Sequence, residues 1–286
     1  MKIAMSGSTG FVGSYLKAVF AEKGWLVVPL LRADFVQGVA AVHAKIEGCS
    51  AVVNLAGAPI AARWTKAHKK ALYESRVPLT QKIAAAMHGL ERRPAVFISA
   101  SGVGIYPSGG PWNEDDGECP DDFLGRLAWD WEQAALEARS AGVRTAVFRF
   151  GVVLGRGGGA LAKMLPLFRL GLGGVIGTGM QPVSWVHIAD LARAISAAIE
   201  DTSFGGVYNL CAPQPTTNAG LTRALAAALN RPAFLPVPAF AVKLAFGEGA
   251  CVLLDGQIAV PKRLTDAGFR FQYQRIDDAL ADLLSD

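Results

Sequence analysis

The chain has 286 residues, of which 51% are hydrophobic and 18% charged, with a formal net charge of +4. This composition supplies a sizeable core and excludes an intrinsically disordered protein. The charge comes without a run of Lys or Arg, so no nucleic-acid partner is expected. No apolar stretch could span a bilayer and no signal-peptide pattern opens the sequence. We therefore predict a cytoplasmic protein with no membrane partner.

Apolar runs alternate with helical patterns along the chain. Strands that are apolar on both faces and separated by helices are typical of a parallel α/β sheet. We predict a Rossmann-type doubly wound sheet over 1–210 and a smaller C-terminal substrate subdomain over 211–286, with 155–182 contributing to the substrate side. The predicted strands are 2–5, 25–31, 51–57, 95–101, 145–154 and 206–210, and the predicted helices are 11–23, 66–88, 127–141 and 189–200.

The four cysteines do not form a recognisable site. They are far apart and include no C-x-x-C pair, which excludes the familiar zinc and dithiol patterns and suits a reducing compartment. No cluster of His, Cys, Asp and Glu has metal-ligand spacing either, so no metal is expected. The cysteines are Cys49, Cys119, Cys211 and Cys251.

Three glycines follow the first predicted strand at three-residue spacing. Gly7 allows a tight turn, Gly10 lets the backbone approach a pyrophosphate, and Gly13 lets the following helix pack on the strand. The helix N-terminus adds unpaired N–H groups for the phosphates. A glycine-rich turn without a ligand is the alternative. Because this turn is the first β–α connection of an alternating chain, it predicts a dinucleotide site made of Gly7, Ser8, Thr9, Gly10, Phe11, Val12 and Gly13.

The end of the second strand indicates which dinucleotide is bound. Arg32 stands there, and an arginine suits the 2′-phosphate of NADP. Asp34 follows two residues later and would suit the 2′-hydroxyl of NAD if the strand ended later. Arg32 could also simply be a solvated strand end. The predicted cofactor is NADP, and Arg32 is the residue predicted to bind its 2′-phosphate.

Several segments resemble the extended short-chain dehydrogenase/reductases, the NAD(P)-dependent epimerase/dehydratase group. They are the glycine turn, "NLAG" at 54–57, "FISAS" at 97–101 and "VSWVHIADLARAI" at 183–195. Longer blocks, above all 150–191, resemble an uncharacterised epimerase-like subfamily with its own C-terminal domain. The resemblance covers essentially the whole chain and implies a Rossmann domain with a bound nicotinamide dinucleotide, NADP.

The resemblance also assigns cofactor contacts outside the glycine turn. Small residues after the third strand would form a wall of the cofactor site, although a packing turn is the alternative. Arg76 would contact the cofactor, where the residues alone also allow a solvated helix face. The wall residues are Leu55, Ala56 and Gly57.

The family's proton-transfer dyad is missing. The family uses a Tyr and a Lys four residues later on one helix face, where the lysine charge lowers the tyrosine pKa. None of the five tyrosines here is followed by Lys at that spacing. The dyad positions are apolar in either alignment register: Leu124 and Ala128, or Phe123 and Leu127.

The remaining catalytic candidates are Ser101, which matches the family's strand-end serine, and Tyr106. For Ser101 the alternative is a hydroxyl satisfying local backbone, and for Tyr106 it is a packed aromatic with its hydroxyl at the surface. Without a lysine beside it, Tyr106 is expected to keep its ordinary pKa of about 10. Glu132 could be a helix-surface residue and is not counted among the candidates.

Two glycine-rich stretches, 155–160 and 171–181, are interpreted as mobile loops that could cover a substrate. Possible substrate contacts in this region are Lys163, Arg169 and Gln181. Further on, Asp190 is expected to serve the start of a helix, and His187 is expected to be structural rather than a base.

The sequence thus predicts an NADP-binding, epimerase-like oxidoreductase with a non-standard active site. It acts on a small-molecule substrate that the sequence does not name, and a homodimer is compatible with it. The alternative is a non-catalytic protein that binds or senses NADP(H), which the missing dyad supports. The intact cofactor motif and Ser101 support the enzyme.

Overall fold

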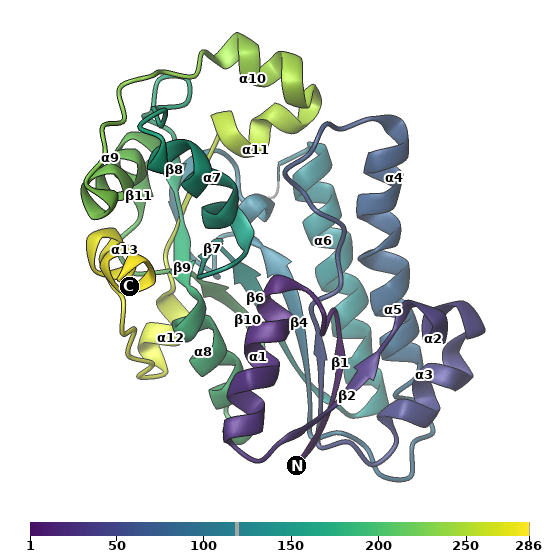
Figure 1. The fold of residues 1–286 in the computed structure, drawn as a ribbon. Helices are drawn as coiled ribbons and strands as arrows, with labels where there is room; N and C mark the ends of the chain where they lie inside the picture. Colours follow the sequence, from purple (N-terminus) through teal and green to yellow (C-terminus); the bar gives the residue numbers. More distant parts are fainter. Residues whose placement is uncertain (118–119, 286) are drawn as a thin grey trace.

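The computed structural model describes residues 1–117 and 120–285, which leaves Cys119 outside the described residues. Its centre is a six-stranded sheet in the order β10-β6-β4-β3-β1-β2, and every neighbouring pair is parallel (Figure 1). The predicted α/β class with a doubly wound parallel sheet is confirmed. The strands are β1 (Lys2–Ser6), β2 (Leu26–Leu30), β3 (Ala51–Asn54), β4 (Val96–Gly102), β6 (Arg144–Phe150) and β10 (Gly206–Leu210).

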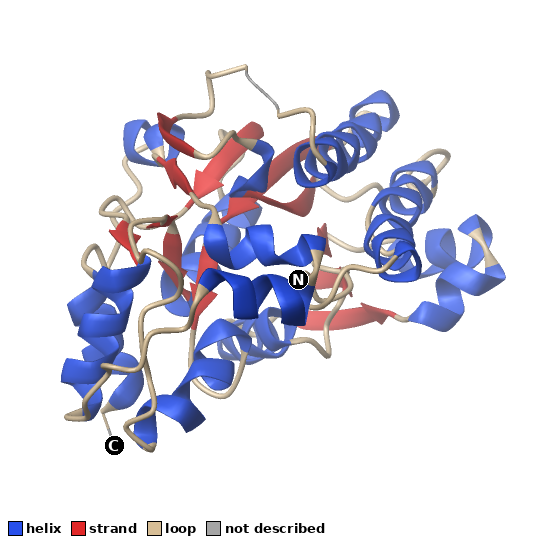
Figure 2. Cartoon of the chain, turned by 90° about the horizontal axis from the view of Figure 1, so that it is seen from above, coloured by secondary structure: helices blue, strands red, loops and turns tan. Residues whose placement is uncertain are grey.

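Helices cover both faces of this sheet (Figure 2). Leu16 and Phe20 of α1 and Leu191 and Ile195 of α8 pack on one face. The other face carries apolar side chains of α3, α5 and α6. This double cover is why the strands are apolar throughout. The helices of this domain are α1 (Phe11–Glu22), α2 (Arg32–Gln37), α3 (Val39–Ile46), α4 (Lys66–Glu74), α5 (Val77–Ala85), α6 (Phe123–Leu136) and α8 (Ile188–Glu200), with 3₁₀ turns η1 (Val103–Ile105) and η2 (Glu137–Ala141).

Two predicted elements are each divided in the structure. The helix predicted over 66–88 stops at Glu74, and α5 begins at Val77 with a proline in its first turn, where a missing N–H costs nothing. The strand predicted over 145–154 breaks at Gly151. A Cβ on Gly151 would lie 2.7 Å from the Ser184 carbonyl oxygen, and the chain continues as β7 (Val152–Leu154), which pairs with β9 (Trp185–His187) outside the main sheet.

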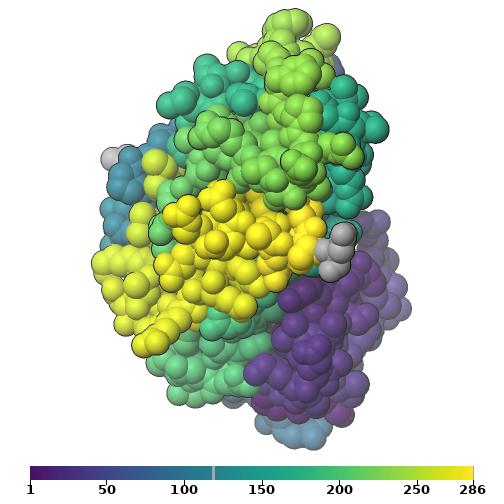
Figure 3. Space-filling view, turned by 60° about the vertical axis from the view of Figure 1, so that its left-hand side comes forward, coloured from purple at the N-terminus to yellow at the C-terminus, as the bar shows by residue number. Residues whose placement is uncertain are grey.

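A second core lies beyond the sheet and combines residues from two parts of the chain. Leu161 and Phe168 of α7 (Gly159–Arg169) pack with Leu221 and Leu225 of α9 (Asn218–Leu229) and Leu280 of α13 (Ile276–Leu284). In Figure 3 the C-terminal residues (yellow) lie between this region above and α1 (purple) below. The other elements are β5 (Gly109–Trp112), β8 (Pro182–Val183), β11 (Thr216–Thr217), α10 (Ala239–Phe246), η3 (Glu248–Ala250), α11 (Cys251–Leu254), β12 (Gln257–Ala259) and α12 (Lys262–Asp266).

The loop between β3 and α4, together with α4 itself, contacts the C-terminal part of the chain. The Trp64 N–H donates to the Phe246 carbonyl over 3.1 Å, and Lys69 forms an ion pair with Glu248. Within the described residues, no helix combines the length and apolar character needed to cross a bilayer.

The order of the strands locates a ligand crevice. The chain passes from β1 to β2 on one side and then returns to β3 on the other. Ligands of open α/β sheets bind outside the carboxyl ends of strands at such a switch point. Here the switch point lies between the turn after β1 and the loop after β3.

Candidate dinucleotide and active site

The glycine turn after β1 has the geometry that a pyrophosphate needs. Gly7 has φ +68°, and a Cβ there would lie 2.8 Å from the Leu55 carbonyl carbon. A Cβ on Gly13 would lie 2.2 Å from the Gly7 oxygen. Gly10, in contrast, is exposed, and a Cβ there would meet only the Gly7 oxygen, at 3.3 Å. Gly7 and Gly13 therefore serve the turn and the packing, while the surface at Gly10 is left open to a ligand.

Helix α1 begins at this open surface. Its N-cap residue, Gly10, provides no side-chain cap, and no acidic residue stands in the first turn. The first N–H groups and the helix dipole are thus available to an anion. The residues of this turn fit the pyrophosphate of a dinucleotide.

The other predicted residues of the turn differ in burial. Ser8 is buried, Thr9 is exposed, and Val12 packs on the core beside α8. The Phe11 ring lies against the glycine loop that follows β7. A Cβ on Gly158 would lie 2.1 Å from the Phe11 ring, so this loop is glycine-rich because it packs on an aromatic ring.

A buried polar network joins three neighbouring strands beside the turn. Ser6 Oγ donates to Asn54 Oδ1 over 2.6 Å, and Asn54 Nδ2 donates to Thr80 Oγ1 over 2.8 Å and to Ser99 Oγ over 3.3 Å. Trp131 Nε1 of α6 donates to the same Thr80 oxygen. The network fixes the edge of the sheet that faces the crevice. Sequence reasoning missed it, although each strand residue is a polar group ending an apolar run.

Arg76 supports the loop after β3 from behind. Its Nη2 donates to the Ala58 carbonyl over 3.0 Å, and a Cβ on Gly57 would lie 2.9 Å from its Cζ. The guanidinium also lies over the Trp131 ring, and burial lowers the pKa of Arg76 to about 10. Arg76 thus positions Leu55–Gly57. Its contact with the cofactor stays a prediction.

Arg32 and Asp34 have opposite environments at the end of β2. Arg32 is exposed at the start of α2, and none of the described residues forms a hydrogen bond or ion pair with its guanidinium. The buried Asp34 carboxylate accepts from the Leu31 N–H over 2.6 Å and from Lys45 Nζ over 2.7 Å. Burial opposes ionisation, but these two donors outweigh it and hold the pKa of Asp34 below its usual value. The geometry favours Arg32 over Asp34 as the group available to a ribose phosphate.

The dyad positions of α6 form apolar contacts. Phe123 packs edge-on against Trp64 with ring centroids 5.2 Å apart, and Leu124 lies beside Gly104. Leu127 and Ala128 are buried, Ala128 in a cluster with Tyr106. No proton-transferring group is present at any of these positions.

Glu132, which from the sequence could lie on the helix surface, is instead buried. Its Oε1 accepts from Ser101 Oγ and from Arg149 Nε, both over 2.8 Å, and its Oε2 accepts from Arg149 Nη2 over 2.9 Å. The buried stripe of α6 faces β4 and β6, where Ser101 and Arg149 are paired in register. Burial by itself would lower the pKa of Arg149, but the hydrogen bonds and charge of Glu132 outweigh it and hold that pKa above its ordinary value.

Tyr106 extends this network away from the crevice. Its ring is 1% exposed, and its Oη accepts from Arg149 Nη1 over 2.6 Å. The same hydroxyl lies within donating distance of Asn209 Oδ1, at 2.9 Å, and of the Asn113 carbonyl, at 3.0 Å. The hydroxyl is therefore not at the surface, and burial raises the pKa of Tyr106 although Arg149 opposes the shift. The expectation of an ordinary pKa is corrected accordingly.

The hydroxyl groups of the two catalytic candidates, Ser101 and Tyr106, differ in the hydrogen bonds that they can still form. Ser101 donates a hydrogen bond to Glu132, so its oxygen keeps lone pairs that can accept one. Tyr106 has both a donor and acceptors within the chain, which suits a positioning residue better than an acid. Catalysis by either residue stays a prediction.

His187 and Asp190 are structural, as expected. His187 Nδ1 accepts from the Ala189 N–H at the start of α8, its ring stacks on Tyr273, and burial lowers its pKa although Asp282 opposes the shift. Asp190, fully buried, also accepts from the Gln272 and Tyr273 N–H groups and so holds the C-terminal segment.

The three predicted substrate contacts differ in whether their polar groups already form hydrogen bonds within the chain. Gln181 is 9% exposed, and its Nε2 donates to the Ile176 and Leu253 carbonyls, so its amide is used within the chain. Lys163 reaches the Ala61 carbonyl at 3.4 Å. Arg169 has no partner among the described residues.

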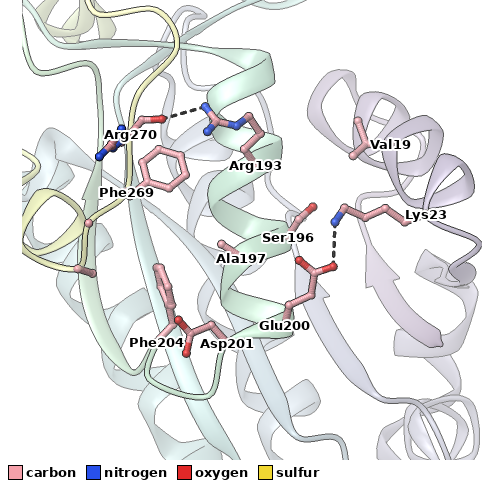
Figure 4. A pocket seen from close by; sticks show the side chains of 12 residues that line it. Val19, Lys23, Arg193, Ser196, Ala197, Glu200, Asp201, Phe204, Phe269 and Arg270 are labelled. Atoms are coloured by element: carbon pink, nitrogen blue, oxygen red, sulfur yellow. Dashed lines mark hydrogen bonds and ion pairs between the residues drawn. The ribbon is translucent and has the colours of Figure 1, made fainter.

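Two cavities lie away from the glycine turn. One, of about 560 Å³, lies between α1, α8 and the segment 267–270, with Ser196 and the Lys23–Glu200 ion pair in its wall (Figure 4). The other, of about 530 Å³, lies among α10, α11 and the segment 177–181. Neither is lined by a predicted cofactor or catalytic residue.

Known proteins resemble this chain along its whole length. The chloroplastic homologue of epimerase family protein SDR39U1 from Arabidopsis thaliana is 37% identical, covering 99% of this chain and 87% of that protein. Epimerase family protein YfhF of Bacillus subtilis is 35% identical, with 100% and 99% covered. The crystal structure of human SDR39U1, solved with NADPH, superposes with a TM-score of 0.92 at 35% identity and covers 99% of both chains.

Two family descriptions match consecutive parts of the chain. Residues 237–283 match a domain of unknown function, DUF1731. Residues 3–211 match the NAD dependent epimerase/dehydratase family. The predicted nicotinamide dinucleotide is confirmed at the level of this family, and NADPH is the form bound by the human relative. With its parallel sheet, glycine turn and full-length relatives, this chain belongs to the NAD-dependent epimerase/dehydratase family.

Proposed function

We propose that this protein is an NADP-dependent oxidoreductase whose substrate is a small molecule less polar than a sugar nucleotide. The observation that carries the proposal is the combination of an open glycine turn at the switch point with apolar dyad positions on α6. The turn supports cofactor binding, and the apolar helix face supports a substrate with few hydroxyl groups.

Different residues of the chain bind different parts of NADP. The turn at Gly10 and the first N–H groups of α1 hold the pyrophosphate. Arg32 holds the 2′-phosphate with a guanidinium that no other described residue uses. Leu55–Gly57, supported by Arg76, form a wall beside them. Once bound, NADP supplies or accepts the hydride.

Ser101 is the residue proposed to meet the substrate. Because its hydroxyl donates its hydrogen bond to Glu132, its oxygen accepts a hydrogen bond from a substrate hydroxyl and orients it. Arg149 keeps Glu132 in place by two hydrogen bonds. Without a lysine-tuned tyrosine, proton transfer lacks its usual catalyst in the family, so turnover is expected to be slow.

The second candidate function is a non-catalytic protein that binds or senses NADP(H). It is favoured by the internal engagement of both candidate hydroxyls, since Ser101 and Tyr106 already donate to groups of the chain. Both candidate functions use the same cofactor site. They differ only in whether hydride is transferred between the bound NADP(H) and a substrate.

A single assay series separates the candidates. NADPH binding is measured by fluorescence titration, and NADPH oxidation is followed with a panel of apolar aldehydes and ketones. Conversion of UDP-hexoses to their epimers is followed by chromatography, because epimerisation consumes no net NADPH. The enzyme proposal expects turnover on a member of the apolar panel, reduced about 10²-fold or more in Ser101→Ala and unchanged in Ser203→Ala on the surface. Binding without turnover on any compound supports the second candidate. Robust epimerisation of a UDP-hexose contradicts the substrate proposed here.

A further inference from the structure

The C-terminal part of the molecule has an exposed apolar surface, here called the apolar cap. Nine of the eighteen large apolar side chains exposed on the described residues belong to it. Five of them are more than 70% exposed, which is unusual for side chains of this size in a water-facing position. The apolar cap comprises Leu167, Leu170, Leu172, Met180, Phe234, Leu235, Val237, Phe240 and Leu244.

The segments of the apolar cap lie side by side. The Leu235 N–H donates to the Gly173 carbonyl over 3.2 Å, and the Val237 N–H donates to the Val175 carbonyl over 2.8 Å. These bonds join the segment after α7 to the one before α10. Helix α10 then presents Phe240 and Leu244, one turn apart and both more than 70% exposed, while Val242 is buried. Figure 3 shows residues around 231–247 (green) at the top of the molecule.

The two stretches of chain that supply the apolar cap carry charges of one sign. No Asp or Glu occurs between residues 138 and 189 or between 202 and 247, the two stretches that supply all nine side chains. Arg169, Arg231 and Lys243 stand among those side chains, and none of them has a side-chain hydrogen bond or ion pair with a described residue. Lys243 shares the wall of the 530 Å³ cavity with Glu248 and Asp255, and Glu248 is already paired with Lys69.

We propose that the apolar cap docks on an anionic lipid bilayer, with Phe240 and Leu244 entering the headgroup boundary and the basic side chains facing lipid phosphates. Apolar side chains flanked by unpaired cations are the combination that binds such an interface. A second copy of the chain fits less well, because two such surfaces would place cations opposite cations. Docking needs no spanning helix, so this proposal replaces the expectation that no membrane is a partner.

The test measures sedimentation of the full chain with vesicles. Wild type is expected to sediment with phosphatidylcholine vesicles containing phosphatidylglycerol and much less with phosphatidylcholine alone, and the binding is expected to weaken between low and high salt. Phe240→Ser/Leu244→Ser and Arg169→Glu/Lys243→Glu should each reduce vesicle affinity about tenfold or more. The matched control, Leu26→Ser/Val36→Ser, removes two apolar side chains that are 59% and 80% exposed at the far end of the sheet, and it should bind as wild type does.

Two results would overturn the proposal. One is wild type that stays in solution with anionic vesicles at low salt. The other is a dimer, detected by light scattering, that Phe240→Ser/Leu244→Ser converts to monomers, since the apolar cap would then be an interface between copies. NADPH titration of every variant verifies the fold, and its result is independent of vesicle binding, so failure here does not affect the proposed function.

Discussion

Replacing Arg149 tests whether the buried network beside Ser101 depends on one ion pair. Arg149→Met removes both hydrogen bonds to Glu132 and the donor to Tyr106, and leaves a carboxylate that is 3% exposed without its cation. Breaking a buried pair from one side typically costs about 3–5 kcal/mol, because the remaining charge is uncompensated. That is a large part of a typical stability of about 5–15 kcal/mol.

The double variant Glu132→Leu/Arg149→Met separates the charge from the packing. Replacing both members of a buried pair by apolar residues is often neutral or stabilising. Ser101 loses its acceptor in the double variant, which adds about 1–3 kcal/mol of cost if its hydroxyl finds no new partner. We therefore expect the double variant to be more stable than Arg149→Met alone.

Urea unfolding followed by tryptophan fluorescence gives the free energies. Arg144→Met is the matched control, because Arg144 lies on the same strand and donates to the Ala198 and Phe204 carbonyls but to no carboxylate. The control is expected to lose less than Arg149→Met does. A loss below about 1 kcal/mol in Arg149→Met, or a double variant less stable than the single one, would refute the account of Glu132 as a charge held by Arg149.

Three further predictions concern the cofactor site and the pH dependence of stability. Gly10→Val should abolish NADPH binding in a fluorescence titration, because the side chain occupies the place of the pyrophosphate, and wild-type affinity in this variant would exclude the assigned site. Arg32→Ala should weaken NADPH binding by about 1.5–3 kcal/mol and NADH binding hardly at all; equal losses for both, or a wild type that prefers NADH, would identify Asp34 as the reader instead. Burial lowers the pKa of His187, so the unfolded chain binds a proton that the folded chain does not, and stability should fall as the pH decreases below the unfolded value of about 6.5. His187→Asn keeps a helix-capping side chain and should show a shallower loss of unfolding free energy between pH 7 and pH 5, whereas an unchanged slope would contradict this role.

The sequence by itself determined the features that depend on neighbouring residues. Runs of apolar residues predicted all six strands of the main sheet, because a strand covered on both faces has no polar side. The spacing of Gly7, Gly10 and Gly13 predicted the turn, since backbone freedom and close packing there admit no side chain. The absence of the tyrosine–lysine dyad could also be read directly from the residues.

Only the tertiary structure decided which polar side chains meet. Glutamate is a residue type that usually lies at the surface. Glu132 is buried because it stands on the face of α6 that packs on β4 and β6. Arg149 lies in a strand that reads as apolar, so no local pattern indicated its charge partner. Asp34 and Arg32 are two residues apart, yet Lys45 from α3 engages only Asp34. These contacts form between segments distant in sequence, and the packing that brings them together is a property of the whole fold.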